Sequence, residues 1–418
     1  MKCPPIRHWT NLIDTILSPM YPAFGSWTEE HMKKWSILFA IMVACACSKR
    51  EEVQMPLAGQ DYAPNPLTTI LPVGVRTVEL LDPSRPKEDG TPRRLVTEIW
   101  YPAGDEAKNM EGYTYDPLEQ APDAVKPLIQ GIQTGVLRTS AVRDAPVRKE
   151  NRPFPLVIFS HGAYAIRFQN AFFTVALASH GYIVLAPDHE GNTLWDLLQN
   201  GYDPKSLNDS AFARPVDVEF LVTKAKEWDE DPKNDFYGAI SLEGVGVSGH
   251  SFGGYTALAV MCRIPNLKAI LAMSPAAEMT VLGGCLPEEV FVPIMIMGGE
   301  MDKTLDFKYS MEAPWEYFNP PKFLVDVKRA GHYSFTDLCR FNLTEIAEKA
   351  GYPDAKEALG DGCGAQNWDY EKVADATRYY GISLMNTYLR NSALSMDYVT
   401  ADPKPLFQNE VEVRYVLK

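Results

Sequence analysis

The stretch Gly244-Val245-Gly246-Val247-Ser248-Gly249-His250-Ser251-Phe252-Gly253-Gly254 decides the fold. Its first half is a short apolar run typical of a buried strand, and a helix-prone run from Tyr255 to Met261 follows. Between them lies a Gly-x-Ser-x-Gly pattern, which is typical of a sharp strand-to-helix turn that exposes a serine hydroxyl. We expect both flanking glycines to be required, because a Cβ there would clash with the adjacent strand or helix. Ser251 is therefore the candidate nucleophile.

The composition is that of an ordinary globular protein with one large core. The chain has 418 residues, of which 46% are hydrophobic and 22% are charged. Its formal net charge of −14 argues against binding to nucleic acid or to an anionic membrane through broad electrostatics. One α/β domain of this length is plausible, and a second independent domain is not required.

The N-terminal region has the layout of an export signal. Met32, Lys33 and Lys34 precede a short apolar run that ends in small residues and two cysteines. We interpret residues 1–47 as an upstream segment plus a lipoprotein-type signal peptide, with lipid attached at Cys45 or Cys47. Met32 would be the true start, and the Pro-rich residues 48–70 a tether. The protein would then be exported to a bacterial periplasm or outer membrane. The alternative is a buried N-terminal helix in a cytosolic protein.

Residues 71–418 alternate between strand-like and helix-like segments. This alternation predicts an α/β fold with a mostly parallel central sheet and helices on both faces. Residues 193–213 look like a polar loop, Pro215 is expected in the first turn of a helix, and residues 103–152 give mixed signals. The predicted strands are Val75–Leu81, Leu95–Tyr101, Pro155–Phe159, Tyr182–Ala186, Gly244–Ser248, Ala269–Met273, Val292–Met297 and Phe323–Val327. The predicted helices are Ala171–His180, Pro215–Trp228, Tyr255–Met261 and Lys372–Leu389.

The partners of Ser251 are expected beyond the carboxyl ends of these strands. A serine hydroxyl needs an adjacent base, and His332 is the only histidine that follows Ser251 in the sequence. An acid should lie between them after a strand, and Asp302 follows the run Ile294 to Gly299 in that way. The rival carboxylates are Glu300, Asp306 and Asp326. The predicted catalytic triad is Ser251, Asp302 and His332.

An oxyanion hole needs two backbone N–H groups near the nucleophile. One should belong to Phe252, which follows the nucleophile, and the other to Ala163, in the loop after the first core strand. Gly162 would let that loop approach the substrate closely. Tyr164 and His250 are candidate substrate-binding residues, whereas His161 is expected to be a structural hydrogen-bonding group.

No cofactor and no metal are expected. The one run that suggests a metal is Asp188-His189-Glu190, but three adjacent residues rarely converge on one ion.

These motifs together resemble a known family. They are Phe159-Ser160-His161-Gly162, Asp188-His189-Glu190-Gly191-Asn192, Gly249-His250-Ser251-Phe252-Gly253-Gly254 and Gly331-His332. The chain resembles the serine α/β-hydrolases grouped as platelet-activating factor acetylhydrolases and predicted dienelactone hydrolases, with a more distant likeness to polyester (PET) hydrolases and cutinases. The resemblance covers roughly residues 70–390. It implies an α/β-hydrolase fold, carboxylic ester hydrolysis without a cofactor, and Phe252 and Ala163 as oxyanion donors.

The sequence departs from this family pattern in two places. In the acetylhydrolases the acid follows the strand after the elbow, where this chain reads Ala272-Met273-Ser274-Pro275. Asp302 instead matches the position of the acid in polyester hydrolases and in α/β-hydrolases generally. The dienelactone hydrolases use a cysteine nucleophile, where this chain has Ser251.

The sequence therefore predicts an exported, lipid-anchored serine hydrolase of carboxylic esters that works through an acyl-enzyme. The substrate would be a small or lipid-like ester with a short acyl, phospholipid-acetyl or polyester-like structure. No nucleic-acid partner is expected, and the membrane would be contacted only through the N-terminal lipid. The alternatives are an amide or peptide hydrolase and a non-catalytic binding protein on the same fold.

Four cysteines lie in the predicted domain, and an exported protein meets an oxidising compartment. Cys339 and Cys363 flank a polar segment after His332, and a bridge between them would close a loop of about 25 residues, worth roughly 3 kcal/mol. Cys262 and Cys285 form the natural second pair. The alternative for Cys262 is a buried apolar residue.

Overall fold

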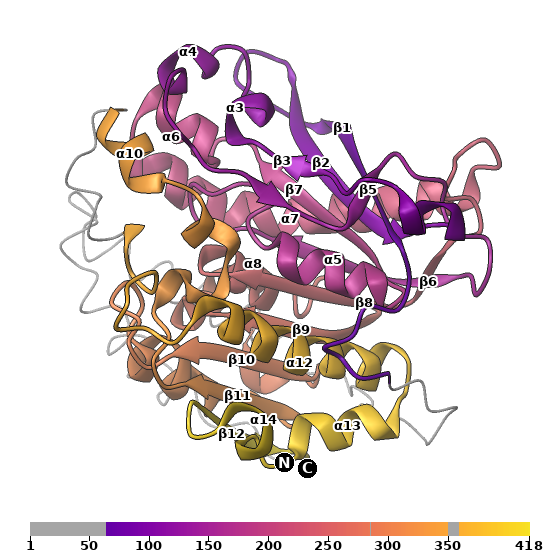
Figure 1. Cartoon of the computed structure of the whole chain (residues 1–418), viewed down its shortest axis with the longest axis vertical. Helices are drawn as coiled ribbons and strands as arrows, with labels where there is room; N and C mark the ends of the chain where they lie inside the picture. Colours follow the sequence, from indigo (N-terminus) through magenta and orange to yellow (C-terminus); the bar gives the residue numbers. More distant parts are fainter. Residues whose placement is uncertain (1–63, 285, 350–358) are drawn as a thin grey trace, which may run out of the picture. The chain divides into compact units, whose positions relative to one another are not determined.

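A computed structural model of the chain describes residues 64–284, 286–349 and 359–418. The described residues form a large β-sheet with helices on both of its faces (Figure 1). The strands of this sheet are β1 (Val73–Pro86), β2 (Pro92–Pro102), β5 (Ala141–Arg143), β6 (Phe154–Ser160), β7 (Ile183–His189), β8 (Ile240–His250), β9 (Leu267–Met273), β10 (Ile294–Gly299), β11 (Lys322–Val327) and β12 (Val411–Val416).

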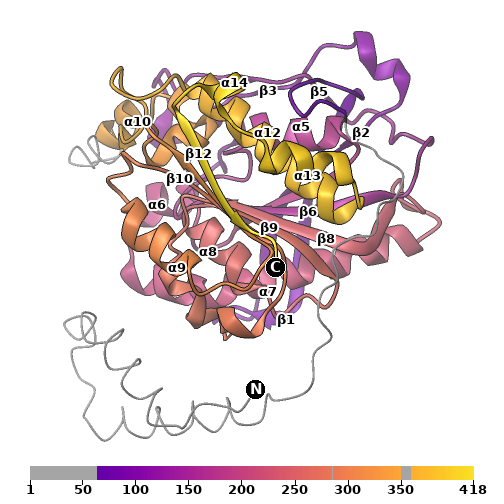
Figure 2. The same cartoon turned by 90° about the horizontal axis from the view of Figure 1, so that it is seen from below.

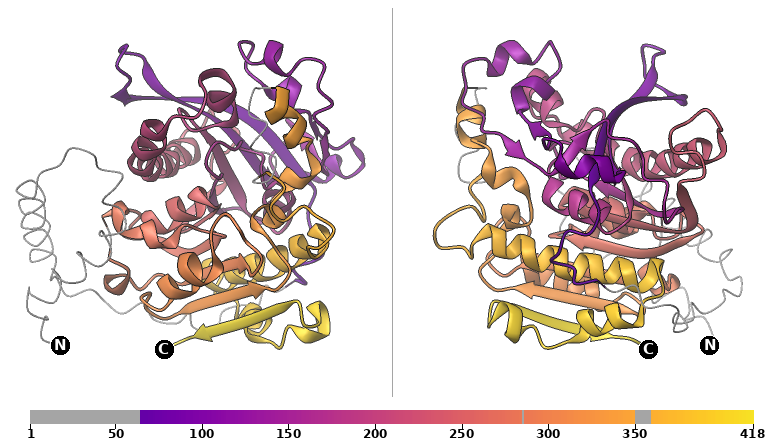
Figure 3. Two further views of the ribbon diagram at one scale, coloured as in Figure 1. Left: turned by 90° about the vertical axis from the view of Figure 1, so that its left-hand side faces the viewer. Right: turned by 45° about the vertical axis from the view of Figure 1, so that its right-hand side comes forward.

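Parallel strands form the centre of the sheet. The spatial order is β12-β11-β10-β9-β8-β6-β7-β2-β1-β5, and the strands from β11 to β7 pair in parallel. β2 pairs antiparallel with β7, and β12 pairs antiparallel with β11. Every residue of β6 and β7 is buried, as expected for strands covered on both faces. The predicted mostly parallel sheet is confirmed, and Figure 3 shows its twist from β1 in indigo to β12 in yellow.

Two apolar cores lie on opposite faces of the sheet. Helices α5 (Ala171–Ser179) and α12 (Tyr370–Leu389) contribute to one core, and α7 (Pro204–Glu230) and α8 (Phe252–Ala259) contribute to the other. Figure 2 shows these two helix layers on either side of the strands. The smaller α-helices of the described part are α3 (Pro117–Gln120), α4 (Lys126–Ile129), α6 (Leu194–Asn200), α9 (Ala313–Trp315), α10 (Leu343–Lys349), α13 (Ala393–Thr400) and α14 (Lys404–Phe407).

The start of α7 differs from the sequence-based prediction. Pro215 was expected in the first turn of the helix, but α7 begins at Pro204 and Pro215 lies in its interior. A proline there has no N–H for the carbonyl four residues earlier, which belongs to Ala211. The Tyr255 hydroxyl of α8 donates to the Ala211 oxygen at 2.8 Å and so satisfies it. Residues 193–213, expected to be a loop, are therefore mostly helical, in α6 and the first turns of α7.

Residues 103–152, whose signals were mixed, form short elements at one end of the sheet. They contain β5, the helices α3 and α4, and a small ribbon of β3 (Thr114–Tyr115) with β4 (Leu137–Arg138). A buried Tyr115 ring stacks on Phe168, with ring centroids 4.7 Å apart. This region packs on the core but contributes none of the predicted catalytic residues.

The predictions for the N-terminus lie outside the described residues. This applies to the signal peptide, to lipidation at Cys45 or Cys47, and to the tether as far as residue 63. Within the described part of the chain, none of the helices is long and apolar enough to cross a membrane.

Candidate active site

Ser251 occupies a strained turn between β8 and α8. Its backbone has φ 57° and ψ −121°, a conformation that costs energy for a residue other than glycine. The Ser251 N–H donates to the Met273 carbonyl of β9 at 2.8 Å, which fixes the turn against the neighbouring strand. A Cβ on Gly249 would meet the Gly253 carbonyl, and a Cβ on Gly253 would meet the Ser160 carbonyl. Both glycines are therefore required by close backbone approach, as the sequence predicts.

The structure brings Asp302 and His332 together. Asp302 follows β10, and His332 opens a short 3-10 helix after β11. Asp302 Oδ2 lies 2.8 Å from His332 Nδ1, and both residues are buried. The other carboxylate oxygen of Asp302 accepts the backbone N–H groups of Thr304 and Leu305 at 2.9 and 2.7 Å. This geometry holds the imidazole with its Nδ1 protonated and leaves Nε2 as the basic nitrogen.

The neighbour of Ser251 in the chain links the turn to His332. His250 Nε2 lies 2.9 Å from the His332 carbonyl oxygen, and the two imidazole centroids are 4.7 Å apart. His250 Nδ1 lies 2.9 Å from Gln169 Nε2, and this NH₂ group can only donate. Burial and the neighbouring His332 lower the pKa of His250 well below its ordinary value. Both ring nitrogens have protein partners, which favours a role in holding the His332 loop over the predicted contact with substrate.

The predicted oxyanion loop lies against the nucleophile. A Cβ added to Gly162 would lie 3.5 Å from Ser251 Cβ, so the two backbones are close neighbours. Ala163 is exposed, whereas Phe252 at the start of α8 is buried. The Gly162 N–H donates to Gln169 Oε1 at 2.9 Å. Gln169 thus contacts both the oxyanion loop and His250, and the sequence analysis did not single it out.

Tyr164 has a positive φ of 50° and is half-buried. Its hydroxyl donates to the Asp203 carbonyl at 2.8 Å, and its ring lies 5.7 Å from that of Tyr202. Tyr164 therefore connects the oxyanion loop to the segment between α6 and α7. Its predicted role in substrate binding stays a prediction.

A buried ionic network lies beneath the oxyanion loop. Asp217 is fully buried and accepts hydrogen bonds from Arg85 and Arg93, while its Oδ2 lies 2.8 Å from His189 Nδ1. Burial is the largest cause that lowers the pKa of His189, to about 4. The other nitrogen of His189 lies 2.9 Å from Ser160 Oγ. The imidazole is therefore neutral near pH 7 and supports the end of β6.

His161 is also buried and neutral. Its Nε2 accepts the His189 N–H at 3.1 Å, which leaves Nδ1 to donate to the Gly162 carbonyl at 2.7 Å. Burial lowers the pKa of His161 well below its ordinary value. These contacts agree with the expected structural role of His161.

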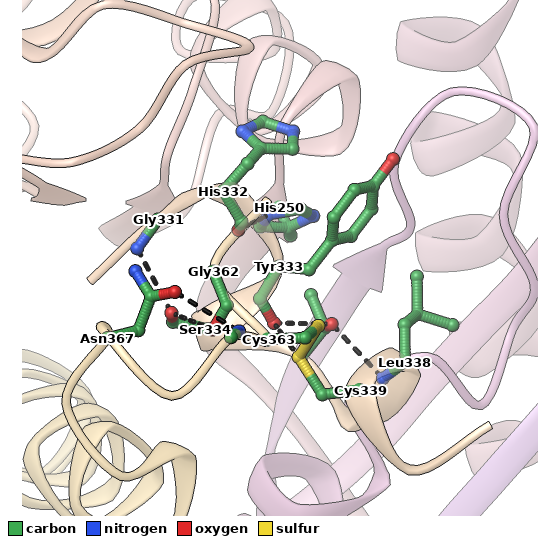
Figure 4. Close-up of a disulfide and its surroundings, with 12 residues drawn as sticks. His250, Gly331, His332, Tyr333, Ser334, Leu338, Cys339, Gly362, Cys363 and Asn367 are labelled. Atoms are coloured by element: carbon green, nitrogen blue, oxygen red, sulfur yellow. Dashed lines mark hydrogen bonds between the residues drawn. A yellow bond between two sulfur atoms is a disulfide. The ribbon is translucent and has the colours of Figure 1, made fainter. Parts of the chain in front are cut away.

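The predicted bridge between Cys339 and Cys363 is present, with a Cα–Cα distance of 5.4 Å (Figure 4). Beside it, Ser334 Oγ accepts the Gly331 N–H and donates to the Gly362 carbonyl at 2.8 Å. Figure 4 shows His332 on the same short loop as these contacts. The bridge therefore lies next to the loop of the candidate base.

Asp361 connects the loops of the acid and the base. Its Oδ2 accepts N–H groups from Lys303 and Thr304, directly after Asp302, and its carbonyl accepts the Tyr333 N–H at 2.8 Å. Cys285 lies outside the described residues, so the pairing of Cys262 with Cys285 stays a prediction.

The carboxylates and histidine at 188–190 bind different partners. Asp188 pairs with Arg167, His189 with Asp217, and Glu190 with Lys87. In the described part of the chain, no group of three or more His, Cys, Asp and Glu side chains gathers in a way that could hold a metal ion.

The sequence is similar to platelet-activating factor acetylhydrolases over part of its length. Residues 91–197 match the family model of platelet-activating factor acetylhydrolase, isoform II. The chain is 24% identical over 250 residues to platelet-activating factor acetylhydrolase of Canis lupus familiaris, covering 49% of this chain and 52% of the relative. It is 23% identical over 247 residues to the Cavia porcellus protein, covering 49% and 53%. The matches thus span about half the length of these curated relatives.

A solved structure supports the same fold. The ferulic acid esterase from Streptomyces cinnamoneus superposes with a TM-score of 0.57 at 22% identity, covering 84% of this chain and 98% of that chain. The mostly parallel sheet, the sharp turn after β8 and the helices on both faces are features of the α/β-hydrolase fold. The chain therefore has the α/β-hydrolase fold and is similar in sequence to the platelet-activating factor acetylhydrolases.

Proposed function

We propose that the protein hydrolyses carboxylic esters through an acyl-enzyme on Ser251. Two observations together carry this proposal: the strained turn at Ser251, whose neighbour His250 contacts the His332 carbonyl, and the buried pair of His332 and Asp302, joined at 2.8 Å. A serine in such a turn costs conformational energy, and an elbow exposes the hydroxyl for attack. The buried carboxylate of Asp302 fixes the His332 imidazole with its proton on Nδ1. Nε2 of that imidazole is then the base that the Ser251 hydroxyl needs.

The acylation step follows from this arrangement. His332 Nε2 takes the proton of Ser251 as Oγ forms a bond to the ester carbonyl carbon. The carbonyl oxygen becomes an oxyanion, which the N–H groups of Ala163 and Phe252 stabilise. The bond to the leaving alcohol then breaks, and the proton on Nε2 passes to the alcohol oxygen. Asp302 stabilises the imidazolium formed in between.

Deacylation repeats these steps with water. His332 removes a proton from water, the hydroxyl oxygen bonds to the acyl carbon, and the same two N–H groups hold the second oxyanion. The bond to Ser251 Oγ then breaks, Oγ regains a proton from His332, and the carboxylic acid leaves. No cofactor takes part in this scheme.

We propose small or lipid-like esters as the substrates, with a short acyl, phospholipid-acetyl or polyester-like structure. The names of the similar proteins support this class, since one is an acetylhydrolase and another an esterase. We also propose that the protein is exported and anchored by a lipid at Cys45 or Cys47, because the sequence from Met32 onward has a lipoprotein-type signal.

Hydrolysis of p-nitrophenyl acetate tests the proposed activity. The protein should release p-nitrophenol, and Ser251→Ala should reduce kcat by several orders of magnitude with little change in Tm, because the triad works as a unit. A fluorophosphonate probe should label the wild-type protein at Ser251 and leave the variant unlabelled. Ester hydrolysis that survives Ser251→Ala would contradict the mechanism, and an inactive wild-type protein would favour a binding role.

A further inference from the structure

Arg214 places a fully buried guanidinium directly beneath the oxyanion loop. It lies in α7, one residue before Pro215, and its side chain has no exposed surface. Desolvation by burial lowers the pKa of Arg214 to about 9, so the group is still a cation near pH 7. A buried cation costs several kcal/mol of solvation unless hydrogen bonds replace the lost water. Its partners therefore show what the charge contributes.

The partners of Arg214 are carbonyl oxygens of the loop that carries the proposed oxyanion donor and two oxygens of Asn192, which follows β7. Nη2 donates to the Gly162 carbonyl at 3.1 Å and to the Asn192 carbonyl at 3.2 Å, and it also bonds the Asn192 side-chain oxygen. Nη1 donates to the His161 carbonyl. The guanidinium carbon lies 4.8 Å from the centre of the Phe252 ring. One side chain thus contacts the residues on both sides of the proposed oxyanion hole.

The hydrogen bond to Gly162 has a specific consequence for Ala163. The Gly162 carbonyl and the Ala163 N–H belong to one planar trans peptide, so they point in opposite directions. Arg214 and His161 Nδ1 both donate to this carbonyl, at 3.1 and 2.7 Å, which turns the carbonyl toward the buried side of the loop. The Ala163 N–H therefore points away from Arg214. A donor on the carbonyl also polarises the amide and strengthens its N–H as a hydrogen-bond donor.

We propose that Arg214 is a positioning residue of the oxyanion hole, which fixes the Gly162–Ala163 peptide so that the Ala163 N–H faces the oxyanion on the Ser251 adduct. The inference rests on the ester-hydrolase function proposed above. Arg214 does not touch the substrate; it acts through the peptide that does. Without it, the Gly162 carbonyl would keep His161 Nδ1 and, at 3.3 Å, the Ala165 N–H as donors, but it would lose the donor that reaches it from α7, and the peptide could tilt.

The test uses Arg214→Lys and Arg214→Met in the full-length protein. Lysine keeps the charge but cannot donate to several carbonyls in a fixed fork, and methionine keeps only the length of the side chain. Arg93→Met is the matched control, because Arg93 belongs to the buried network beneath the loop through Asp217, but it donates to no carbonyl of the oxyanion loop and its other acceptor is the Glu190 carbonyl. The control should lower Tm without changing the oxyanion hole.

The readout is the ionisation of a tetrahedral adduct. A short-chain trifluoromethyl ketone forms a hemiketal with Ser251, and fluorine NMR follows the pKa of the hemiketal oxygen. Loss of a complete oxyanion donor costs about 10²–10³ in kcat, so a displaced donor should cost about 10–100-fold with KM little changed. The hemiketal pKa should rise by about one to two units in Arg214→Met, since one unit corresponds to a tenfold change in oxyanion stabilisation.

The possible outcomes are distinct. A raised hemiketal pKa and lower kcat in both Arg214 variants, with Arg93→Met unchanged in both, would support the inference. Variants with a lower Tm but the hemiketal pKa and kcat of the wild type would overturn the inference and show that Arg214 has only a structural role. If Arg214→Met does not fold, Arg214→Lys decides on the same criterion. A wild-type protein that forms no adduct at Ser251 would instead contradict the proposed function itself.

Discussion

Replacement of Asp302 by asparagine should inactivate the protein through the orientation of one proton. Asp302 Oδ1 accepts the N–H groups of Thr304 and Leu305, and Oδ2 faces His332 Nδ1. In Asp302→Asn the side-chain amide must turn its oxygen toward the N–H groups of Thr304 and Leu305, because only the oxygen can accept from them. The amide NH₂ group then faces His332 and can only donate to Nδ1. The imidazole must carry its proton on Nε2, where it can no longer accept the proton of Ser251.

The expected loss in kcat is about 10⁴-fold, by comparison with the same change in serine proteases. This corresponds to about 5 kcal/mol of transition-state stabilisation, since each tenfold change is worth 1.36 kcal/mol. The opposite orientation of the amide would restore the tautomer but would set NH₂ against the N–H groups of Thr304 and Leu305. The Thr304 N–H would keep Asp361 Oδ2 as an acceptor, but the half-buried Leu305 N–H would lose its partner. An unpaired buried donor costs about 1–3 kcal/mol, so this orientation is disfavoured.

The assay is kcat for p-nitrophenyl acetate, normalised to the active sites counted by the fluorophosphonate probe. Glu300→Gln is the matched control, because Glu300 lies two residues away, is exposed, and was the nearest rival for the acid. We expect Glu300→Gln to retain wild-type kcat. An Asp302→Asn variant near wild type, together with an inactive Glu300→Gln variant, would refute the assignment of the acid.

Three further predictions concern the disulfide, the anchor and pH. The double variant Cys339→Ser with Cys363→Ser should lower the free energy of unfolding, measured by urea denaturation, by about 3 kcal/mol in the chain-entropy model. It should also lower kcat for ester hydrolysis. If both values were unchanged, the bridge would have no supporting role. When the protein is expressed in a bacterium, it should fractionate with membranes and be released by Cys45→Ala with Cys47→Ala; a product that is already free of membranes and has an intact N-terminus would exclude lipidation. The free energy of unfolding should fall as pH drops from about 6.5 toward 4, because buried histidines with a lowered pKa take up protons in this range only on unfolding. His189 alone should contribute about 3 kcal/mol to this loss. Burial also raises the pKa of four carboxyls, Asp188, Glu278, Asp326 and Asp337, the last to about 7, and these act in the opposite direction; Tm measured across this range tests the balance. The histidines concerned are His161, His180, His189 and His250.

The elbow was predictable because its requirements are local. Gly249 and Gly253 are required because the backbone of neighbouring segments approaches them closely. The residues before Ser251 are apolar because this part of β8 is buried on both faces of the sheet. The pairing of Asp302 with His332 also followed from sequence, since in a parallel sheet the residues after successive strands meet at one edge. The strand order made this inference work, because β10 and β11 are neighbours.

The helix around Pro215 could not be predicted from local rules. A proline normally begins a helix because its missing N–H leaves an earlier carbonyl unpaired in the interior. Here the Tyr255 hydroxyl, from a helix 40 residues later in the chain, supplies the missing donor. Only the packing of α7 on α8 makes that contact possible. Proline does leave a carbonyl without its helical donor, as the rule says, but a tertiary hydrogen bond satisfies that carbonyl and the helix continues.

The roles of Arg214 and Gln169 were hidden for a similar reason. Neither belongs to a motif, and an arginine in an amphipathic helix is normally read as part of the solvated face. Arg214 instead points inward, to the carbonyls of a loop about 50 residues earlier. Gln169 lies only seven residues after Gly162 and accepts its N–H through a side chain. The local sequence carries no signal for either contact with the predicted oxyanion loop.

The attachment of the segment from α6 to the first turns of α7 bears on how substrate reaches the site. Thr193 forms a bridge with Ala165, the Asp203 carbonyl accepts the Tyr164 hydroxyl, and the Ala211 carbonyl accepts that of Tyr255. A segment held to the core at its start, middle and end cannot swing away as a hinged lid. The protein would then have no closed state for an aggregated lipid surface to open. The rate of hydrolysis of a short-chain ester should therefore rise smoothly as the ester concentration passes the critical micellar concentration, without interfacial activation.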